Sequence, residues 1–524
     1  MQPILKKYHI YILLTIFFIV ALFIRLYSLG NIPGGFHEDE AHIGYNAYSL
    51  LKTLHDKNNV YLPLSIDQFG DFRPSGLHFL TIPSVAFFGL NEFATRFPVA
   101  VVGSLCIIVF YLVALEIFRN KKIALIAAGL MAVNPWEFIA SRSTSESIVA
   151  LFFVMLGIYA LLVVVRINKS VKTNRPKALG FAILAFLSFL LSFQFYHAAR
   201  YFVPIIVAFI LLIVTFDKSI TKKTKTLLLI GAVCLFILLG LLLKLGSGSG
   251  RVEEISIFTN PATAIEFWKQ KSEDKGLSPI LVQFFHNKLT AYGYTALTNY
   301  GEHFTPDFLF FKGGLPPRYQ VPWNGNYYPV DALFIIIGFS VMLTKLLERK
   351  GGTFLLALPF IWLAVGPLPA AFTFEDIPHF QRAIMMMPAL LLFAAYGLYY
   401  IFTYKVSKKI LILLYLIIGG IMLYQVILFA HDYFHHTLTH NANSRNEGEK
   451  DLISTVSQYQ KDGRNIIMTT QNGNRLIFYL FFNKIDPATF QKLGSPRDAN
   501  NLQYDGVTYR TDVDEWSLDF GRKF

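Results

Sequence analysis

Apolar residues in this chain occur in long runs that are separated by short polar segments. Eleven of these runs approach or exceed the roughly 20 residues that a helix needs to cross the hydrocarbon core of a bilayer. They span residues 8–29, 94–118, 123–139, 148–165, 178–195, 201–216, 226–245, 330–347, 354–372, 383–404 and 410–430. The pattern predicts a mainly α-helical, polytopic membrane protein with about eleven transmembrane helices.

Composition and charge agree with this interpretation. The chain has 524 residues, of which 54% are hydrophobic and only 15% are charged, and a soluble protein of this length could not bury so much apolar surface. Lysines and arginines collect in every second loop, which predicts a cytoplasmic N-terminus and an extracytoplasmic C-terminus in the plasma membrane. The net charge of +13 is therefore a topology signal, and we expect no nucleic-acid partner.

Three long polar segments fall on the side predicted to be extracytoplasmic. Residues 31–91 read as two juxtamembrane helices, one amphipathic (39–54) and one apolar (77–90) that is too short to span. Residues 246–329 are rich in aromatic residues, Gly and Pro, which favours an ordered lid that includes His303 and Arg318. The tail from residue 431 predicts a small α/β domain. We therefore expect a membrane domain at 1–430 and an appended domain at 431–524.

The first of these segments begins with a polar cluster, Glu38-Asp39-Glu40, flanked by His37 and His42. Adjacent helical residues point about 100° apart, so one carboxylate would act on a substrate and the other would support it. A partly desolvated carboxylate can accept a proton from a hydroxyl group. Equally, acidic residues stabilise a helix N-terminus without any catalytic role. Spacing alone leaves both interpretations open.

Further cationic residues lie at the outer ends of other predicted helices. Guanidinium groups suit bidentate phosphate contacts, although a single arginine at a helix mouth can also snorkel to lipid headgroups. Several at one membrane face favour a phosphate site over lipid anchoring alone. The predicted phosphate- and substrate-binding residues are Arg73, Arg142, His197, Arg200, His379 and Arg382.

These motifs resemble those of the C-type glycosyltransferases. The similarity rests on the Asp-Glu pair in the first outer loop, the juxtamembrane helix after it, and the Arg73-Pro-Ser-Gly-Leu77 motif. Within that group the chain is most similar to the protein O-mannosyltransferase and lipid A aminoarabinose transferase branch. The family's motif commonly reads Lys-Pro-Pro-Leu, and this chain departs from it where Ser75 and Gly76 stand.

The resemblance implies that a sugar moves from a polyprenyl-phosphate carrier to a protein, lipid or glycan acceptor at the outer membrane face. By motif position Asp39 matches the family's catalytic acidic residue, with Glu40 beside it. Cationic side chains would neutralise the departing lipid phosphate. No Trp-Trp-Asp motif of the oligosaccharyltransferase catalytic subunits is present, which argues against transfer of a whole oligosaccharide.

The sequence also bears on cofactors and on other classes of function. The branch implies no required cofactor, and a divalent metal at His37 and His42 is left open but not favoured, because their spacing fits no strong site pattern. A lipid-linked sugar transporter or flippase is an alternative, although the predicted spans lack midplane charges. A non-catalytic glycan-binding membrane protein is another.

Overall fold

A computed structural model describes residues 2–68, 70–168, 175–217, 220–245, 254–274, 276–348, 353–462, 466–470, 474–496 and 502–510. The chain divides into two compact units. We name them the bundle unit (Met1–Tyr27 and Val99–His436) and the loop-tail unit (Ser28–Pro98 and Thr437–Phe524). The expected division at residue 430 placed the first outer loop with the membrane helices. That division stays a prediction; in the structure, the first outer loop and the tail form one compact unit and share an apolar core.

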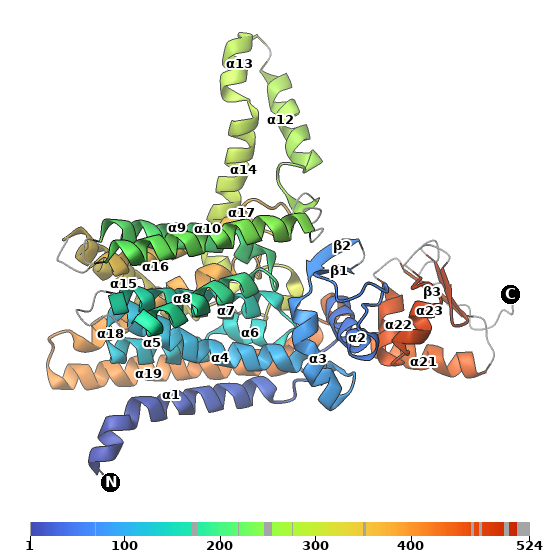
Figure 1. Cartoon of the computed structure of the whole chain (residues 1–524), viewed down its shortest axis with the longest axis horizontal. Helices are drawn as coiled ribbons and strands as arrows, with labels where there is room; N and C mark the ends of the chain where they lie inside the picture. The colour runs from blue at the N-terminus through green and yellow to red at the C-terminus, as the bar shows by residue number, and fades with distance from the viewer. Residues whose placement is uncertain are drawn as a thin grey trace. The chain divides into compact units, whose positions relative to one another are not determined.

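The bundle unit consists almost entirely of helices (Figure 1). Its first half contains α1 (Gln2–Leu26), α4 (Glu92–Phe118), inside which the boundary between the units falls, α5 (Lys121–Val133), α6 (Pro135–Arg142), α7 (Glu146–Asn168), α8 (Arg175–Ser192), α9 (His197–Phe216) and α10 (Lys222–Leu245). Its second half contains α12 (Pro261–Glu273), α13 (Pro279–Phe285), α14 (Lys288–Glu302), η1 (Asp307–Phe311), η2 (Pro317–Tyr319), α15 (Pro329–Leu347), η3 (Thr353–Ala357), α16 (Leu358–Val365), α17 (Leu368–Ala371), η4 (Ile384–Met386), α18 (Met387–Thr403), α19 (Lys408–His431) and η5 (Asp432–His436).

Long apolar helices confirm the predicted multi-pass membrane fold. In the described residues, eight helices are long and apolar enough to cross a bilayer, or up to nine if a bent pair counts as one span. Two of the other predicted spans, 178–195 and 354–372, coincide with the shorter apolar helices Pro176–Ser192 and Leu355–Ala371. The predicted count of eleven is therefore not confirmed, because length and composition do not establish that these two shorter helices cross.

The predicted span at 123–139 is a broken helix. α5 and α6 meet at an angle of 53°, and Asn134 at the break caps α6 by accepting a hydrogen bond from the Glu137 amide. Pro135 follows at the first position of α6, where its missing N–H group costs nothing. Glu137 and Arg25 of α1 form a buried ion pair beside the break. Charge pairing therefore holds this bend in an otherwise apolar environment.

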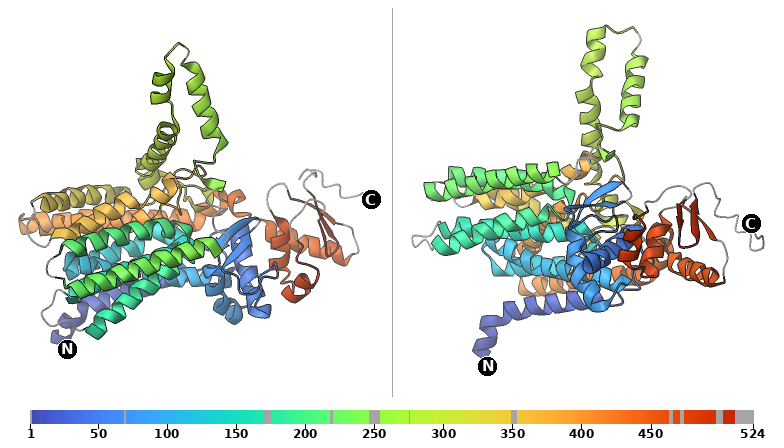
Figure 2. Two further views of the ribbon diagram at one scale, coloured as in Figure 1. Left: turned by 45° about the horizontal axis from the view of Figure 1, so that its top comes forward. Right: turned by 45° about the vertical axis from the view of Figure 1, so that its right-hand side comes forward.

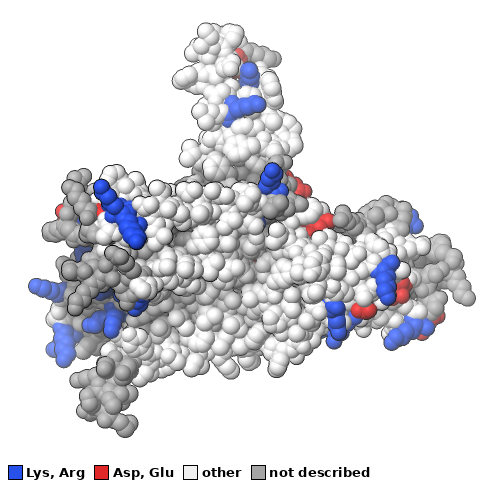
Figure 3. Space-filling model, in the orientation of Figure 1, with Lys and Arg blue, Asp and Glu red and all other residues white. Residues whose placement is uncertain are grey.

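Small residues allow the helices of the bundle to pack closely. In a bilayer the hydrophobic effect does not drive helices together, so close van der Waals packing stabilises their association. A side chain at Gly338 of α15 would meet the Phe393 carbonyl of α18, and one at Gly397 would meet the Phe334 carbonyl. α7 and α18 are largely buried, whereas α1, α10 and α19 are mostly exposed. Lys and Arg gather at one end of the bundle, and its middle carries almost none (Figure 3).

The predicted lid segment, 246–329, contains three helices that the sequence analysis missed. Its first residues, 246–253, lie outside the described part of the chain. α12, α13 and α14 form an arm that stands away from the bundle in each view (Figures 1 and 2). Their starts carry Asn260, Ser278 and Asn287 as N-caps, which are residue types that favour helix initiation. Residues 303–328 form the ordered loop that was expected.

The loop-tail unit combines helices with two small sheets. It contains α2 (Glu38–Thr53), β1 (Ser65–Gln68), β2 (Asp71–Pro74), α3 (Gly76–Phe88), α20 (Thr437–His440), η6 (Asn443–Arg445), α21 (Glu449–Lys461), β3 (Ile466–Thr469), α22 (Arg475–Phe482), α23 (Pro487–Lys492), β4 (Leu502–Tyr504) and β5 (Val507–Arg510). β1 and β2 form an antiparallel hairpin. In the other sheet, β5 lies between β3, to which it is parallel, and β4, to which it is antiparallel.

One apolar core joins the first outer loop to the tail. Tyr45 of α2, Val85 of α3 and Phe481 of α22 belong to this core, together with Val507 of β5. Gly44 lets α22 approach α2 closely, because a side chain there would clash with Phe481. The predicted juxtamembrane helices and the predicted α/β tail are both present. Their shared core fixes α2, which carries the acidic cluster.

Candidate active site

The acidic cluster forms the first turn of α2, and its local sequence explains why the helix begins there. His37 is the N-cap, and its Nδ1 accepts a hydrogen bond from the Asp39 amide at 3.1 Å. Glu40 completes a capping box by accepting the His37 amide at 3.3 Å. Negative charge in this turn also suits the positive end of the helix dipole. The capping interpretation thus applies to Glu40. The Asp39 carboxylate instead contacts the β1–β2 hairpin.

Asp39 is held by two side chains of the β1–β2 hairpin. Its Oδ1 accepts a hydrogen bond from Gln68 Nε2 at 2.6 Å, and its Oδ2 lies 3.3 Å from Arg73 Nη1. Arg73 in turn donates from Nε to Asp71 at 2.9 Å. The Asp39 side chain keeps 18% of its surface exposed. A nearby guanidinium favours the ionised carboxylate, so Asp39 is an oriented and partly accessible carboxylate.

Glu40 and Arg96 form a buried, bidentate ion pair. Nε and Nη2 of Arg96 donate to the two Glu40 carboxylate oxygens at 3.0 and 2.8 Å. The other N–H groups of this guanidinium donate to the carbonyls of Leu29, Pro33 and Gly35. All five donors are thereby satisfied. Both oxygens of Glu40 bind Arg96, which holds the chain before α2, and this contact does not support direct catalysis by Glu40.

Glu38, the third acid, contacts the tail. Its Oε2 accepts a hydrogen bond from the Asn474 amide at 3.2 Å, and its own amide donates to Asn446 Oδ1 at 3.3 Å. These contacts join α2 to the segments before α22 and α21. Of the three adjacent carboxylates, Asp39 is the one that this geometry leaves suited to act on a substrate.

Two buried histidines lie within the same unit as Asp39. Burial, and then the nearby charge of Lys57, hold the pKa of His42 well below its ordinary value. Burial and the charge of Arg73 lower the pKa of His78 to about 3. Asn46 contacts His42 Nδ1 at 3.0 Å and accepts the Lys57 amide at 2.8 Å. Both imidazoles are therefore neutral near pH 7 and add no positive charge for a phosphate.

Within the bundle unit, Arg142 does not have the accessibility that a phosphate contact requires. Its Nη1 donates to the carbonyls of Ile24 and Arg25 at 2.6 and 2.9 Å, and its Nη2 donates to that of Tyr27 at 2.9 Å. These are carbonyls at the C-terminal end of α1, which a helix leaves without intrahelical partners. The Arg142 side chain is fully buried. It caps α1, and we leave it out of the proposed phosphate site.

Arg200 differs from Arg142, whose two Nη nitrogens both donate to backbone carbonyls. It lies in the first turn of α9, where Nε donates to the Phe193 carbonyl at 3.1 Å. Nη1 is buried and has no hydrogen-bond partner among the residues that the structure describes. A buried donor of this kind is costly unless a ligand pairs with it. His197, the first residue of α9, is half-buried in the same turn.

His303 and His379 join the loop before α15 to the segment before η4. His303 is fully buried; its Nδ1 contacts the Asn299 carbonyl at 2.7 Å, and its Nε2 accepts the His379 amide at 3.0 Å. Burial lowers the pKa of His303 to about 4. Both ring nitrogens are thus engaged with backbone, which does not support a direct contact between His303 and a substrate; the lid itself stays a prediction. His379 Nδ1 accepts the amides of Gln381 and Arg382.

The structure brings three of the predicted polar segments together in the bundle unit. Gln381 Nε2 donates to Tyr319 at 2.6 Å and to Ser145 at 3.2 Å. Nearby in the chain, Arg382 donates to Thr373 and to the Glu375 carbonyl, both at 2.9 Å. Arg318 is half-buried with its guanidinium over the Tyr319 ring. The loops at 141–146, 303–328 and 379–382 therefore meet through hydrogen bonds.

Sequence reasoning missed several of these partners. Gln68 and Asp71 flank a turn between two four-residue strands, which are too short to give a clear alternating pattern. Arg96 lies inside a predicted apolar span, where a charged residue signals a buried partner. That signal was readable from the sequence, although it does not identify Glu40 as the partner.

The chain is similar to known glycosyltransferases in part of its sequence. Residues 15–246 match the family described as dolichyl-phosphate-mannose-protein mannosyltransferase. A curated protein of Archaeoglobus fulgidus, dolichyl-phosphooligosaccharide-protein glycotransferase 2, is 29% identical over 160 residues, which are 28% of this chain and 26% of that protein. The chain thus matches about a quarter of the length of this relative.

Two solved structures share the fold. The oligosaccharyltransferase AglB from Archaeoglobus fulgidus, in complex with an inhibitory peptide and a dolichol-phosphate, aligns with 97% of this chain and 62% of its own at 15% identity and a TM-score of 0.55. ArnT from Cupriavidus metallidurans, bound to undecaprenyl phosphate, aligns with 93% of this chain and 88% of its own at 11% identity and a TM-score of 0.50. The predicted resemblance is confirmed over residues 15–246, which match the protein mannosyltransferase family, and the chain shares its fold with the two solved structures.

Proposed function

We propose that this chain is a membrane-embedded glycosyltransferase that moves one sugar from a polyprenyl-phosphate carrier to an acceptor at the extracytoplasmic face. The observation that carries the proposal is the geometry of Asp39. This carboxylate is partly exposed and is oriented by Gln68 and Arg73, whereas Glu38 contacts the tail and Glu40 binds Arg96. Asp39 lies within the matched residues 15–246. The lipid phosphates in the two structures of similar fold support a polyprenyl-phosphate donor.

The proposed reaction assigns Asp39 to the acceptor. Its carboxylate orients the acceptor hydroxyl and takes the proton as the hydroxyl oxygen bonds to the anomeric carbon. The bond between that carbon and the phosphate oxygen breaks, and its electron pair leaves with the lipid phosphate. Attack opposite the leaving group inverts the anomeric centre. Arg73 keeps the carboxylate ionised, and Gln68 fixes its direction.

The bundle unit would supply the donor site. Arg200 has a buried nitrogen without a protein partner in the described chain, which suits it to a phosphate oxygen. His197, His379 and Arg382 complete the proposed set, with Arg318 on the neighbouring loop. Positive charge at this site stabilises the phosphate as it departs. Because Arg142 caps α1 and His303 is bound by backbone, neither has a direct role in the proposal.

Topology follows from the distribution of charge. We assign the end of the bundle that gathers Lys and Arg (Figure 3) to the cytoplasm. The N-terminus is then cytoplasmic, and the tail is outside the plasma membrane. Absence of the Trp-Trp-Asp motif supports transfer of one sugar over transfer of an oligosaccharide. The acceptor is a protein, a lipid or a cell-surface glycan.

Mass spectrometry of envelope proteins and glycolipids from cells with and without the gene tests this function. The proposal predicts that deletion removes one sugar mass from at least one extracytoplasmic acceptor. The wild-type gene should restore this mass, and the Asp39→Asn gene should not. An unchanged set of glycans, with lipid-linked sugar accumulating on the cytoplasmic face, would instead indicate a transporter.

A further inference from the structure

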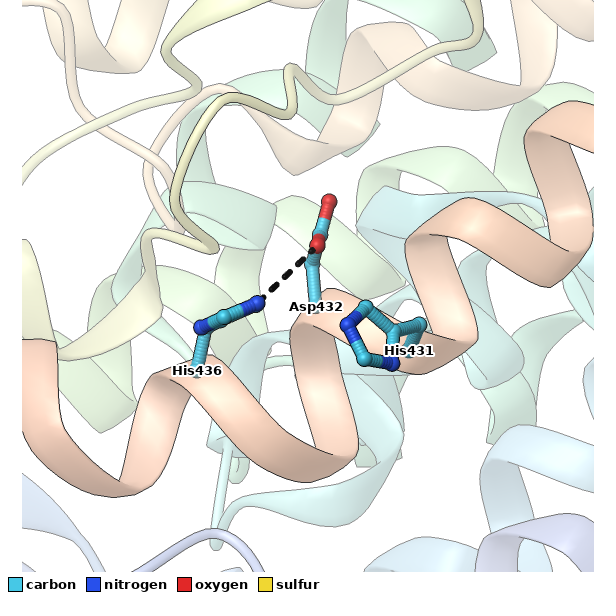
Figure 4. A group of neighbouring side chains, drawn as sticks. All are labelled: His431, Asp432 and His436. Carbon is cyan, nitrogen blue, oxygen red and sulfur yellow. Dashed lines mark ion pairs between the residues drawn. The ribbon is translucent and has the colours of Figure 1, made fainter.

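The outer end of the last long helix carries a group of metal-ligand side chains that the proposed reaction does not use. α19 ends at His431 and continues into the single π-helical turn η5. His431, Asp432 and His436 gather at this junction (Figure 4). One ligand atom from each lies within 4.8 Å of the other two. Among the described residues, this is the one group of three or more His, Cys, Asp or Glu placed so closely.

The π-helical turn explains why these three residues meet. A π-helix closes hydrogen bonds between residues five apart, which is wider than the α-helical turn. His436 is therefore brought over both His431 and Asp432, which are five and four residues before it. In a continuing α-helix, a residue five positions away points to a different side. Single π-turns of this kind occur frequently at functional sites.

The carboxylate of this group is already oriented. Asp432 is buried, and its Oδ2 accepts a hydrogen bond from Asn324 Nδ2 at 2.8 Å. Its Oδ1 lies 3.9 Å from His436 Nε2. Asn324 is itself anchored, because the same nitrogen donates to the Pro322 carbonyl at 2.7 Å. A second-sphere hydrogen bond that fixes a ligating carboxylate is typical of metal sites in proteins.

The two imidazoles complete the arrangement. The His436 ring lies edge-on to Trp323, with 5.2 Å between the ring centroids, and this contact limits its orientations. His431 is exposed, so its side chain can rotate. Bonds of 2.0–2.2 Å to a tetrahedral ion require ligand atoms about 3.4 Å apart. The three atoms lie within 4.8 Å of one another, so the widest pair must close by at most about 1.4 Å, a distance that rotation of His431 can supply.

We propose that His431, Asp432 and His436 bind one divalent transition-metal ion, and that Zn²⁺ is the ion that fits best. Two imidazole nitrogens and one carboxylate oxygen suit Zn²⁺ and not Mg²⁺ or Ca²⁺, which prefer oxygen ligands throughout. Three protein ligands leave the fourth tetrahedral position to water or another oxygen donor. The site is separate from the residues proposed for sugar transfer, so its test does not depend on that activity.

Metal binding by the full-length protein in nanodiscs tests the proposal. After chelator treatment, calorimetric titration with Zn²⁺ should give one equivalent of saturable binding. Co²⁺ should give the visible absorption of a tetrahedral complex. His431→Ala should weaken Zn²⁺ binding at least tenfold, and because this side chain is exposed, the variant should fold normally. Asn324→Ala should weaken binding by roughly 10- to 100-fold through the lost orientation of Asp432.

His435→Ala is the matched control, because His435 lies on the same turn with its ring 5.1 Å from that of His431. We expect this variant to bind Zn²⁺ with wild-type affinity. Loss of binding in His435→Ala equal to that in His431→Ala would overturn the ligand assignment and indicate adventitious binding by exposed histidines. Absence of a saturable equivalent in the wild type would overturn the site itself.

Discussion

Because Asp39 and Glu40 have different partners, we predict that isosteric substitutions of the two residues have opposite effects on stability and on sugar transfer. Glu40→Gln removes the charge that compensates Arg96 and sets an amide N–H₂ group against a guanidinium N–H. The Arg96 side chain is fully buried, and that of Glu40 is 6% exposed. Removing one partner of a buried pair costs roughly 3–5 kcal/mol. Asp39→Asn alters a partly exposed pair, whose loss costs about 1 kcal/mol or less.

Hydrogen exchange followed by mass spectrometry measures these free energies in peptides from α2 and residues 29–37. Each 1.4 kcal/mol changes an equilibrium constant tenfold. Glu40→Gln should therefore raise the opening equilibrium of these peptides roughly 100- to 4000-fold. Asp39→Asn should raise it less than about tenfold. Sugar transfer should show the reverse order, with Asp39→Asn inactive and Glu40→Gln partly active under conditions where it remains folded.

Glu92→Gln is a matched control in the same unit, because Glu92 pairs with an exposed lysine, Lys450. A surface pair of this kind contributes at most about 1 kcal/mol, so the exchange of the α2 peptides should stay near wild type. The reasoning is refuted if Glu40→Gln abolishes transfer and leaves hydrogen exchange unchanged. Glu40 would then take part in the chemistry, and the assignment of its two oxygens to Arg96 would be functionally irrelevant.

Three further predictions concern the supporting residues. Gln68→Ala should lower kcat by roughly 10- to 100-fold with little change in the donor KM, because a hydrogen bond to a charged group is worth about 1.5–3 kcal/mol; steady-state kinetics distinguish the two parameters. Arg200→Gln should instead raise the KM for the lipid-phosphate donor about tenfold or more, whereas Arg142→Gln should lower the thermal midpoint; equal KM effects would argue against their separation. His303 has a folded-state pKa of about 4, below the ordinary value of 6.5, so its contribution to stability is complete above pH 6.5 and is lost as the pH falls toward 4; unfolding measured across this range should show a smaller pH dependence in His303→Gln, and an identical pH profile would contradict the burial argument.

Sequence patterns predicted the helical membrane fold where hydrophobic length alone decides it. Long apolar runs must be helical in a bilayer, because every backbone group needs an internal partner, and the runs that became α4, α7, α18 and α19 satisfy this rule. The break between α5 and α6 was harder to predict from the sequence, because Asn134-Pro135 lies within an otherwise continuous apolar run. The arm formed by α12 to α14 was missed although Asn and Ser caps precede its helices.

The candidate site was predictable in its residue types but not in their pairing. Asp39 was identified from its position after the first apolar run and from the resemblance of its motif. The different roles of Asp39 and Glu40 follow from their different partners. Glu40 binds Arg96, which is 56 residues away from it in the chain, and Asp39 binds Gln68, which is 29 residues away from it. Local periodicity holds no information about such contacts. Likewise, Arg142 and Arg200 look equivalent at helix mouths, and only the carbonyls around Arg142 distinguish them.

Single-turnover transfer by the purified protein tests the central claim most directly. Labelled polyprenyl-phosphate sugar and an acceptor taken from the mass-spectrometric comparison would be mixed with wild type, Asp39→Glu and Asp39→Asn in nanodiscs. The account predicts that Asp39→Asn binds the labelled donor with wild-type affinity and transfers sugar at least 100-fold more slowly, because an amide cannot take the hydroxyl proton. Asp39→Glu should retain measurable transfer. Wild-type transfer by Asp39→Asn would contradict the assignment of Asp39 to the reaction.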